Sequence, residues 1–280
     1  MTSPPPPDNV SYLNPGRNVI ALNWDQVERW LTGKLRAVAR PEGRIFLPPP
    51  WEPGNHWALV GPTGEGKSTL AVALLKIRKY VLALDPKGED ETLAASGYQR
   101  VGDVPPRRVG WFWTTPNWPR DIQRRLDSDA PVRLIVGLRA RTDSEDVALQ
   151  KLLRKAIEYC RVSGGWTLYV DEFELLSSQR MFKMGPLIER MLITARRAKT
   201  SVLTSFQAAA WVSKHATRQA TFAVIFPTRD RAMIKAVAES FGRDWRIIAQ
   251  IVDELPPFHC LIIHKSIRAP MIITKAPKAA

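Results

Sequence analysis

The strongest constraint in the sequence is the segment GPTGEGKST at 61–69, which follows the short apolar run HWALV at 56–60. Its glycines, lysine and serine match the spacing of a phosphate-binding loop that joins a buried strand to a helix. In such a loop the backbone N–H groups surround the phosphates, the lysine reaches the outer phosphates and the hydroxyl ligates Mg²⁺. A chance glycine-rich turn would not need this strand and helix. The predicted ATP-binding residues are Gly61, Pro62, Thr63, Gly64, Glu65, Gly66, Lys67, Ser68 and Thr69, with Ser68 also a Mg²⁺ ligand.

A second signal is a pair of acids, Asp171 and Glu172, at the end of the apolar run TLYV at 167–170. Two adjacent carboxylates after a strand, in a chain with a phosphate loop, indicate a Walker B segment. Asp171 is then a Mg²⁺ ligand, and Glu172 is the base that orients and deprotonates a water. Taken alone, the pair is equally typical of a solvated strand end.

Short apolar runs alternate with helical patterns along the rest of the chain, which predicts an α/β fold with a mainly parallel sheet and helices on both faces. The remaining predicted strands are 80–84, 132–136, 201–206, 222–226, 260–264 and 271–274. The predicted helices are 67–77, 144–161, 185–199, 229–240 and 244–253. The Ser-Gly-Gly at 163–165 reads as a turn.

Proline content and apolar spacing divide the chain into four predicted segments. Residues 1–18, with four consecutive prolines, form a flexible arm. Residues 19–54 hold a helix that starts after Asn23, runs through Leu35 and Val38 and stops before Pro41, followed by a proline-rich connector. The ATPase domain spans 55–265, and residues 266–280 form a basic tail.

The net charge of the chain indicates what kind of partner it binds. The chain carries 41 basic and 27 acidic residues, a net charge of +14, which favours a polyanionic partner such as DNA. No apolar stretch is long enough to span a membrane and the N-terminus lacks the features of a secretory signal, so we expect no membrane insertion. Cys160 and Cys260 lie far apart without metal-ligand spacing, which fits a reducing cytoplasm.

Two further segments complete a resemblance to a known family. LALDPKGED places Asp85, Pro86 and Lys87 after the strand that follows the phosphate-loop helix, and ARRAKTSVLTSFQ places Arg196 eleven positions before Gln207. With the two Walker segments, these resemble the FtsK/HerA superfamily of P-loop DNA-pumping ATPases over roughly residues 55–265. Asp85 and Lys87 are also ordinary turn residues, and the arginines also suit a solvated helix end.

The resemblance implies a RecA-like (ASCE-type) fold and a homo-oligomeric ring, hexameric or pentameric, that moves double-stranded DNA. By position, Gln207 senses the γ-phosphate, and Arg196 or Arg197 is an arginine finger that reaches a neighbouring subunit's ATP. Family members usually have glycine where Lys199 stands here, so the choice between the two arginines stays open.

Among such motors, a viral genome-packaging ATPase that docks on a portal or other ring is the preferred reading. A soluble HerA-like plasmid-transfer or repair translocase shares every motif. Two other classes stay open, namely a P-loop phosphotransferase and an ATP-dependent assembly switch.

Basic and aromatic patches offer candidate DNA contacts. Residues 186–220 include six basic residues and one acid, and residues 265–280 include four basic residues and no acid. The six are Arg190, Arg196, Arg197, Lys199, Lys214 and Arg218. Trp111, Phe112, Trp113 and Trp118 form an aromatic cluster that we assign to packing rather than to base stacking.

Overall fold

The computed structural model describes residues 18–40, 43–88, 90–101, 107–109, 112–114, 130–137, 142–178, 182–207 and 214–277. The predicted arm lies outside these ranges apart from Asn18, and the side chains of the aromatic cluster at 111–118 lie outside them as well. Within the described part of the chain, no helix combines the length and the hydrophobicity that crossing a bilayer requires.

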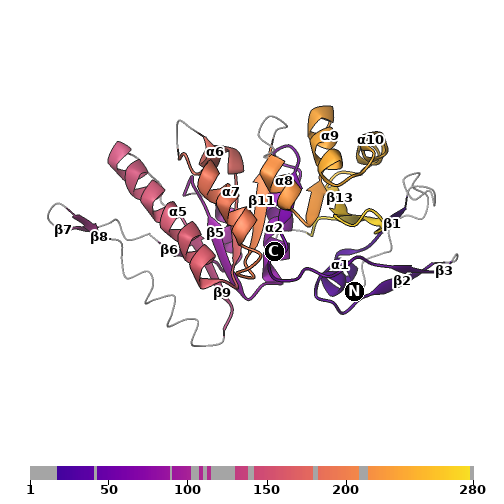
Figure 1. Ribbon diagram of the computed structural model, residues 1–280, viewed down its shortest axis with the longest axis horizontal. Coiled ribbons are helices and arrows are strands. Elements are labelled where there is room, and N and C mark those ends of the chain that lie inside the picture. Colours follow the sequence, from indigo (N-terminus) through magenta and orange to yellow (C-terminus); the bar gives the residue numbers. More distant parts are fainter. Residues whose placement is uncertain are drawn as a thin grey trace.

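A sheet of ten described strands forms the centre of the molecule (Figure 1). In spatial order the strands are β1 (Val19–Ala21), β14 (Met271–Lys275), β13 (His259–His264), β12 (Phe222–Ile225), β4 (Trp57–Val60), β11 (Ser201–Phe206), β10 (Thr167–Val170), β5 (Tyr80–Leu84), β9 (Val132–Val136) and β6 (Gln99–Val101). Neighbouring strands are parallel except at β12–β13 and β13–β14. The predicted mainly parallel sheet is confirmed.

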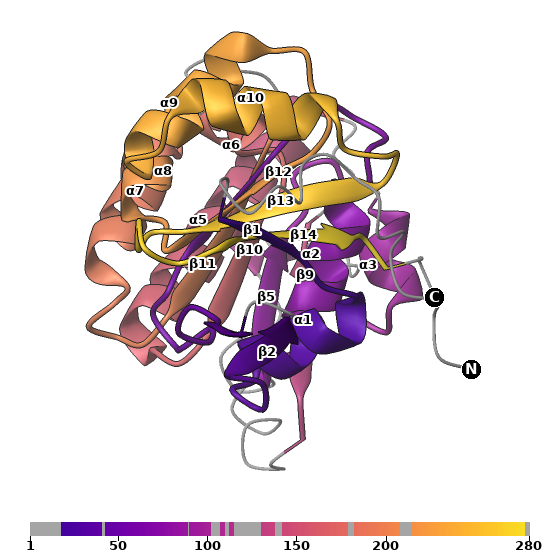
Figure 2. The ribbon, with the colours of Figure 1, turned by 90° about the vertical axis from the view of Figure 1, so that its right-hand side faces the viewer.

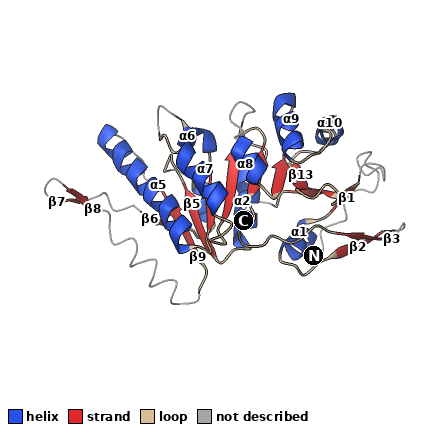
Figure 3. Ribbon diagram, in the orientation of Figure 1, coloured by secondary structure: helices blue, strands red, loops and turns tan. Residues whose placement is uncertain are grey.

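Helices cover both faces of this sheet (Figures 2 and 3). One face carries α1 (Trp24–Leu31), α2 (Lys67–Lys76) and α3 (Glu91–Ala95), and the other carries α5 (Asp143–Ser163), α6 (Phe173–Ser177), α7 (Gly185–Thr194), α8 (Lys214–Gln219), α9 (Arg231–Ser240) and α10 (Trp245–Asp253). Each face has its own hydrophobic core, because alternate strand residues point to opposite sides. In β4, Trp57 and Leu59 join the core under α1 and α2, whereas Ala58 and Val60 join the other.

Two short antiparallel pairs stand apart from the main sheet. They are β2 (Ala37–Arg40) with β3 (Gly43–Phe46), and β7 (Arg107–Val109) with β8 (Phe112–Thr114). Neither pair was predicted from the sequence.

The N-terminal helix is shorter than the sequence predicted. It begins after the capping box at Asn23 but ends at Leu31, where Gly33 adopts a left-handed conformation with φ 78°. Leu35 and Val38 then belong to a loop and to β2, so the prediction of a helix up to Pro41 is wrong beyond Leu31. The apolar spacing misled because both side chains pack against the same core as α1.

Three other boundaries differ from the prediction. The helix predicted over 185–199 ends at Thr194, and Lys199, with a φ of 52°, has a conformation that no helix could include. At the two ends of the domain, β1 and β14 lie within the main sheet. The sheet therefore extends past the predicted limits of 55 and 265 on both sides.

Candidate functional site

The phosphate loop connects β4 to α2, as the sequence predicted. Gly61 has a φ of 154°, and a Cβ atom there would lie 2.7 Å from the Cβ of Phe226. Gly64 and Gly66 also have positive φ values, 89° and 94°. Only glycine satisfies the conformation and the close approach together at position 61, so the loop is shaped by its glycines.

Lys67 lies at the first position of α2 and is buried, with its Nζ donating a 2.6 Å hydrogen bond to the carbonyl of Pro62. Burial lowers the pKa of Lys67, while four carboxylates oppose this shift, with Asp171 the strongest and Glu172 the weakest. Lys67 is buried among these acids, so a further anion can approach it only from the open side of the loop. On that side Thr63 and Gly64 are exposed.

Asp171 follows β10 and faces the phosphate loop. The hydroxyl of Tyr169 donates a 2.9 Å hydrogen bond to Asp171 Oδ1. Burial, with the charges of Asp90 and Glu172, raises the pKa of Asp171 to about 6, although the Tyr169 hydrogen bond acts the other way. The raised pKa means that the charged carboxylate is disfavoured at this position, and a bound cation would stabilise it.

The residues around Asp171 fit Mg²⁺. Ser68 lines the same cleft as Asp171, so a hydroxyl and a carboxylate oxygen, both hard ligands, face one space. Among the described residues, no group of three or more His, Cys, Asp or Glu side chains could hold a metal unaided. Mg²⁺ commonly takes one or two protein ligands and completes its shell with phosphate oxygens and water.

Glu172 adopts a strained backbone conformation. Its φ of 49° and ψ of 57° lie in the left-handed region, where it precedes the short helix α6. Its carboxylate forms an ion pair and hydrogen bond with Lys87 Nζ. Left-handed non-glycine residues tend to occur where the surrounding structure imposes a special side-chain direction. Here that direction is into the cleft.

Gln207 links the phosphate loop to α6. Its side-chain carbonyl accepts a 3.0 Å hydrogen bond from the hydroxyl of Thr63, and its backbone N–H donates a 2.6 Å bond to Glu174 Oε1. The sequence analysis predicted Gln207 but missed Glu174. The available signal was a third acid in the run DEFE at 171–174.

Asp85 has a structural role. It is buried, and its two carboxylate oxygens accept hydrogen bonds from the N–H groups of Gly88 and Asp90, at 2.9 and 3.0 Å, and from Arg100, at 3.0 Å. Gly137 packs so closely that a Cβ there would lie 2.2 Å from the carbonyl of Asp85. Asp85 therefore fixes the turn from which Lys87 extends.

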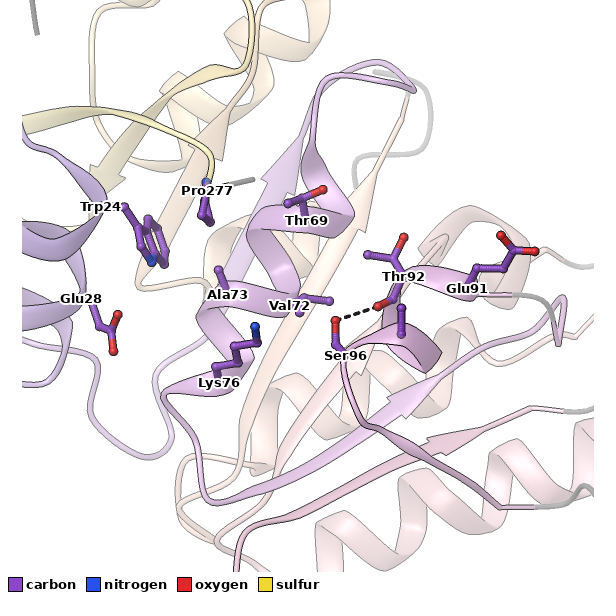
Figure 4. Close-up of a pocket in the computed structure, with 11 residues that line it drawn as sticks. Trp24, Glu28, Thr69, Val72, Ala73, Lys76, Glu91, Thr92, Ser96 and Pro277 are labelled. Atoms are coloured by element: carbon purple, nitrogen blue, oxygen red, sulfur yellow. Dashed lines mark hydrogen bonds between the residues drawn. The ribbon is translucent and has the colours of Figure 1, made fainter. Parts of the chain in front are cut away.

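Two hollows lie beside these residues. One has a volume of about 330 Å³ and is lined by Ser68, Asp85, Lys87, Asp171 and Glu172, among others. The other, of about 440 Å³, runs along α2 from Thr69 to Lys76, between Trp24 of α1 and Thr92 of α3 (Figure 4). Because Thr69 directly follows Ser68, the second hollow begins where the phosphate loop ends.

The structure does not bring Arg196 and Arg197 to this site. Both are exposed in the turn before β11, whereas Gln207 follows that strand's other end. A strand of six residues spans roughly 20 Å, so the arginines lie at the opposite edge of the sheet. The turn contains Lys199 in the left-handed conformation that glycine favours, with φ 52°.

The opposite edge gathers basic residues from both predicted patches. Lys265 donates hydrogen bonds to the carbonyls of Arg218 and Ser240, at 3.1 and 2.6 Å. Burial lowers the pKa of Lys265, and so do the neighbouring charges of Arg196 and Arg218. Residues distant in sequence therefore form one basic cluster, which we define as Arg196, Arg218 and Lys265.

Comparison with known proteins shows similarity in structure. No family model matches the chain, and no curated protein matches it either. The genome packaging NTPase B204 from Sulfolobus turreted icosahedral virus 2, in complex with AMPPCP, has a TM-score of 0.53 and 19% identity over 81% of this chain and 100% of that chain.

A second solved structure with similar architecture is VirB4 of Thermoanaerobacter pseudethanolicus. Its TM-score is 0.54, with 12% identity over 88% of this chain and 96% of that chain. Likenesses at such low identity establish architecture. The chain therefore has the RecA-like P-loop fold that these two proteins share.

Proposed function

We propose that this protein is an ATPase, and the observation that carries the proposal is the convergence of separate segments at one sheet edge. Lys67 and Ser68 of α2, Asp171 and Glu172 after β10, and Gln207 after β11 surround one open loop. Lys67 and the loop N–H groups would hold the phosphates, and Ser68 with Asp171 would hold Mg²⁺. The bound metal would supply charge neutralisation at the phosphates.

In this proposal Glu172 orients and deprotonates the attacking water. Its carboxylate faces the cleft that Ser68 and Asp171 line, which is where a terminal phosphate held by Lys67 would extend. Gln207 contacts the loop through Thr63, so it is placed to respond to the same phosphate. The hydrolytic step needs no acceptor other than water.

We further propose that the ATPase drives double-stranded DNA through a homo-oligomeric ring, a hexamer or a pentamer. Arg196 and Arg197 lie at the edge of the sheet away from their own phosphate loop, so either of them would act as an arginine finger on the ATP of a neighbouring subunit. The net charge of +14 and the basic cluster supply attraction for a phosphate backbone.

The most specific role we propose is viral genome packaging, with docking on a portal or another ring. The likeness to B204, which is described as a genome packaging NTPase, supports this role. A soluble HerA-like plasmid-transfer or repair translocase remains the alternative within the same class. A phosphotransferase or an assembly switch would use the same loop with a different outcome.

The test is steady-state ATP hydrolysis with and without linear duplex DNA, over a range of protein concentrations. We expect turnover that DNA stimulates and that rises cooperatively with concentration. Glu172→Gln should still bind ATP but lose about 10² to 10⁴ in turnover, the range for a general base. Lys67→Ala should lose binding, and Arg196→Ala should lose turnover. Arg154→Ala, which removes an exposed arginine of α5 outside both basic patches, is the matched control and should behave as wild type.

Turnover that ignores DNA and rises linearly with protein concentration would contradict the motor. Radioactive γ-phosphate found in an acceptor instead of in inorganic phosphate would establish a phosphotransferase. Tight binding with no turnover would establish a switch. Near wild-type turnover in Glu172→Gln would remove that residue from the mechanism.

A further inference from the structure

Lys87 lines the cleft together with Ser68 of the phosphate-loop helix, and its side chain extends from a hydrogen-bonded turn. The turn is fixed by the hydrogen bonds to Asp85, which is 4% exposed, whereas the Lys87 side chain is 61% exposed. Its ammonium group pairs with Glu172, whose side chain is 19% exposed. Of the two partners, the lysine is therefore the one that can move.

Glu172 cannot follow a moving partner easily. Its left-handed backbone, with φ 49°, is held between β10 and α6, and the N–H groups of Leu175 and Leu176 both bond to its carbonyl. A lysine has a flexible four-carbon stem with three donors at its end. If the pair separates, the lysine leaves and the carboxylate stays in place.

The charges around the cleft explain what would draw Lys87 away. The carboxylates of Asp171 and Glu172 interact electrostatically with Lys67 on one side and with Lys87 on the other. The cleft of about 330 Å³ between them is lined by Ser68, Asp171, Glu172 and Lys87. A terminal phosphate brought there by the loop presents several charged oxygens, which compete with a single carboxylate for an ammonium group.

We propose that Lys87 exchanges partners when a nucleoside triphosphate binds, leaving Glu172 for the terminal phosphate. Lys87 then becomes a second lysine on that phosphate, opposite Lys67. The freed carboxylate of Glu172 accepts the proton of the attacking water. A diphosphate has no group in the cleft, so with ADP the Lys87–Glu172 pair stays closed.

This inference rests on the proposed ATPase function and predicts discrimination between ATP and ADP. We would measure affinities for a non-hydrolysable ATP analogue and for ADP by calorimetry, together with kcat and KM. Lys87→Ala should weaken analogue binding about tenfold, the worth of one charge-assisted hydrogen bond. It should change ADP binding by less than about twofold and lower kcat, and Lys87→Arg should restore most of both losses.

Lys235→Ala is the matched control. Lys235 is an exposed lysine on α9 that faces a glutamate, Glu239, at 3.9 Å, and it lies outside the phosphate-binding edge. This variant should match the wild type in every measurement. It separates the loss of a particular contact from the loss of one positive charge.

A double-mutant cycle tests the exchange itself. Glu172→Gln removes the competing charge, so the ATP analogue should bind this variant more tightly than the wild type. The gain should vanish in Lys87→Ala/Glu172→Gln. Thermal unfolding of each variant would verify that it folds.

Two outcomes would overturn the exchange while leaving the ATPase proposal intact. One is a Lys87→Ala variant whose affinities for the analogue and for ADP change equally or not at all. The other is an unchanged analogue affinity in Glu172→Gln. A wild-type protein that binds neither nucleotide would instead contradict the proposed function.

Discussion

The two edges of the main sheet each place a charged residue in a left-handed conformation, and the surroundings of the two residues differ. Glu172, with φ 49°, points a carboxylate into a cleft and has an exposed, movable partner in Lys87. Lys199, with φ 52°, closes a turn in which its own N–H bonds to the carbonyl of Arg196. The left-handed conformation thus directs a side chain into the cleft at one edge and allows the chain to turn at the other.

Hydrogen bonding separates the edges in the same way. We call the edge that contains Lys199 the turn edge and the edge that contains Glu172 the phosphate-loop edge. At the turn edge His56 is buried, and both of its ring nitrogens have hydrogen-bond partners. The Val202 N–H donates to Nδ1 at 3.0 Å, and Nε2 donates to the Leu192 carbonyl at 3.1 Å. This arrangement fixes one neutral tautomer. At the phosphate-loop edge, charged groups face open space. Under its exposed basic residues, the turn edge thus holds a buried neutral imidazole, whereas the phosphate-loop edge holds charges that a ligand would rearrange.

The largest expected effect tests how tightly the backbone of the turn edge is packed. A Cβ on Gly164 would lie 2.6 Å from the carbonyl oxygen of Ala198, and its φ is 69°. Gly164→Ala should therefore lower the free energy of unfolding by about 2 to 5 kcal/mol, from backbone strain together with the clash. Gly165 has a φ of 72°, but a Cβ added there would have no atom within 4 Å. Gly165→Ala should therefore lower the free energy of unfolding by only about 1 to 2 kcal/mol. Urea denaturation measures both.

In the folded fraction of both glycine variants, nucleotide affinity should equal that of the wild type. A loss of affinity there would mean that the two edges are coupled. Equal destabilisation by the two substitutions would mean that the contact with Ala198 relaxes at little cost.

The next largest effect is a loss of folding stability at low pH through His56. Burial, followed by the charge of Arg196, lowers the pKa of His56 to about 4 from 6.5, although the Leu192 carbonyl acts the other way. The neutral imidazole is the folded form, so its contribution is complete above pH 6.5 and is lost as the pH falls towards 4. The loss should reach about 2 to 4 kcal/mol, at about 1.4 kcal/mol per pKa unit.

Comparing the unfolding free energy of wild type and His56→Gln between pH 7 and 4 isolates this residue, since other titrating groups cancel in the difference. The two curves should converge as the pH falls. Parallel curves would show that His56 is protonated in the fold and would remove the contrast between this buried neutral ring and the charged groups of the phosphate-loop edge.

The smallest effect compares the two strained residues directly. Lys199→Gly and Glu172→Gly should each raise the unfolding free energy by about 0.5 to 1 kcal/mol, because relief of left-handed strain exceeds the added freedom of the unfolded chain. Lys199→Gly should retain ATP turnover, whereas Glu172→Gly should lose it. Chemical denaturation and a phosphate-release assay check the pair. Turnover lost in Lys199→Gly would mean that the Lys199 side chain itself takes part in the mechanism.

Much of the architecture could be predicted because buried parallel strands leave a direct trace in sequence. VLAL at 81–84 and LIV at 134–136 are continuous apolar runs, since both faces of those strands are covered. The phosphate loop could be predicted because its glycines are required by backbone geometry. These features depend on neighbours in sequence.

The rest depends on tertiary contacts that a sequence does not display. The bond between Gln207 and Glu174 joins segments 33 residues apart, and the pair of Lys87 and Glu172 joins segments 85 apart. Strand β1 is three residues long, too short for any periodicity. The helix predicted beyond Leu31 failed for the opposite reason, since apolar spacing records burial and not the conformation that produces it.

The placement of β1 beside β14 has a consequence for biosynthesis. Val19 is in register with Met271, so the first described strand finds its only described sheet neighbour about 250 residues later. A ribosome would deliver α1 and the phosphate loop long before the strand that anchors β1 exists. Contacts this distant slow folding and leave early segments exposed. The nascent chain would therefore carry β1 without its described sheet neighbour until residues 271–275 emerge.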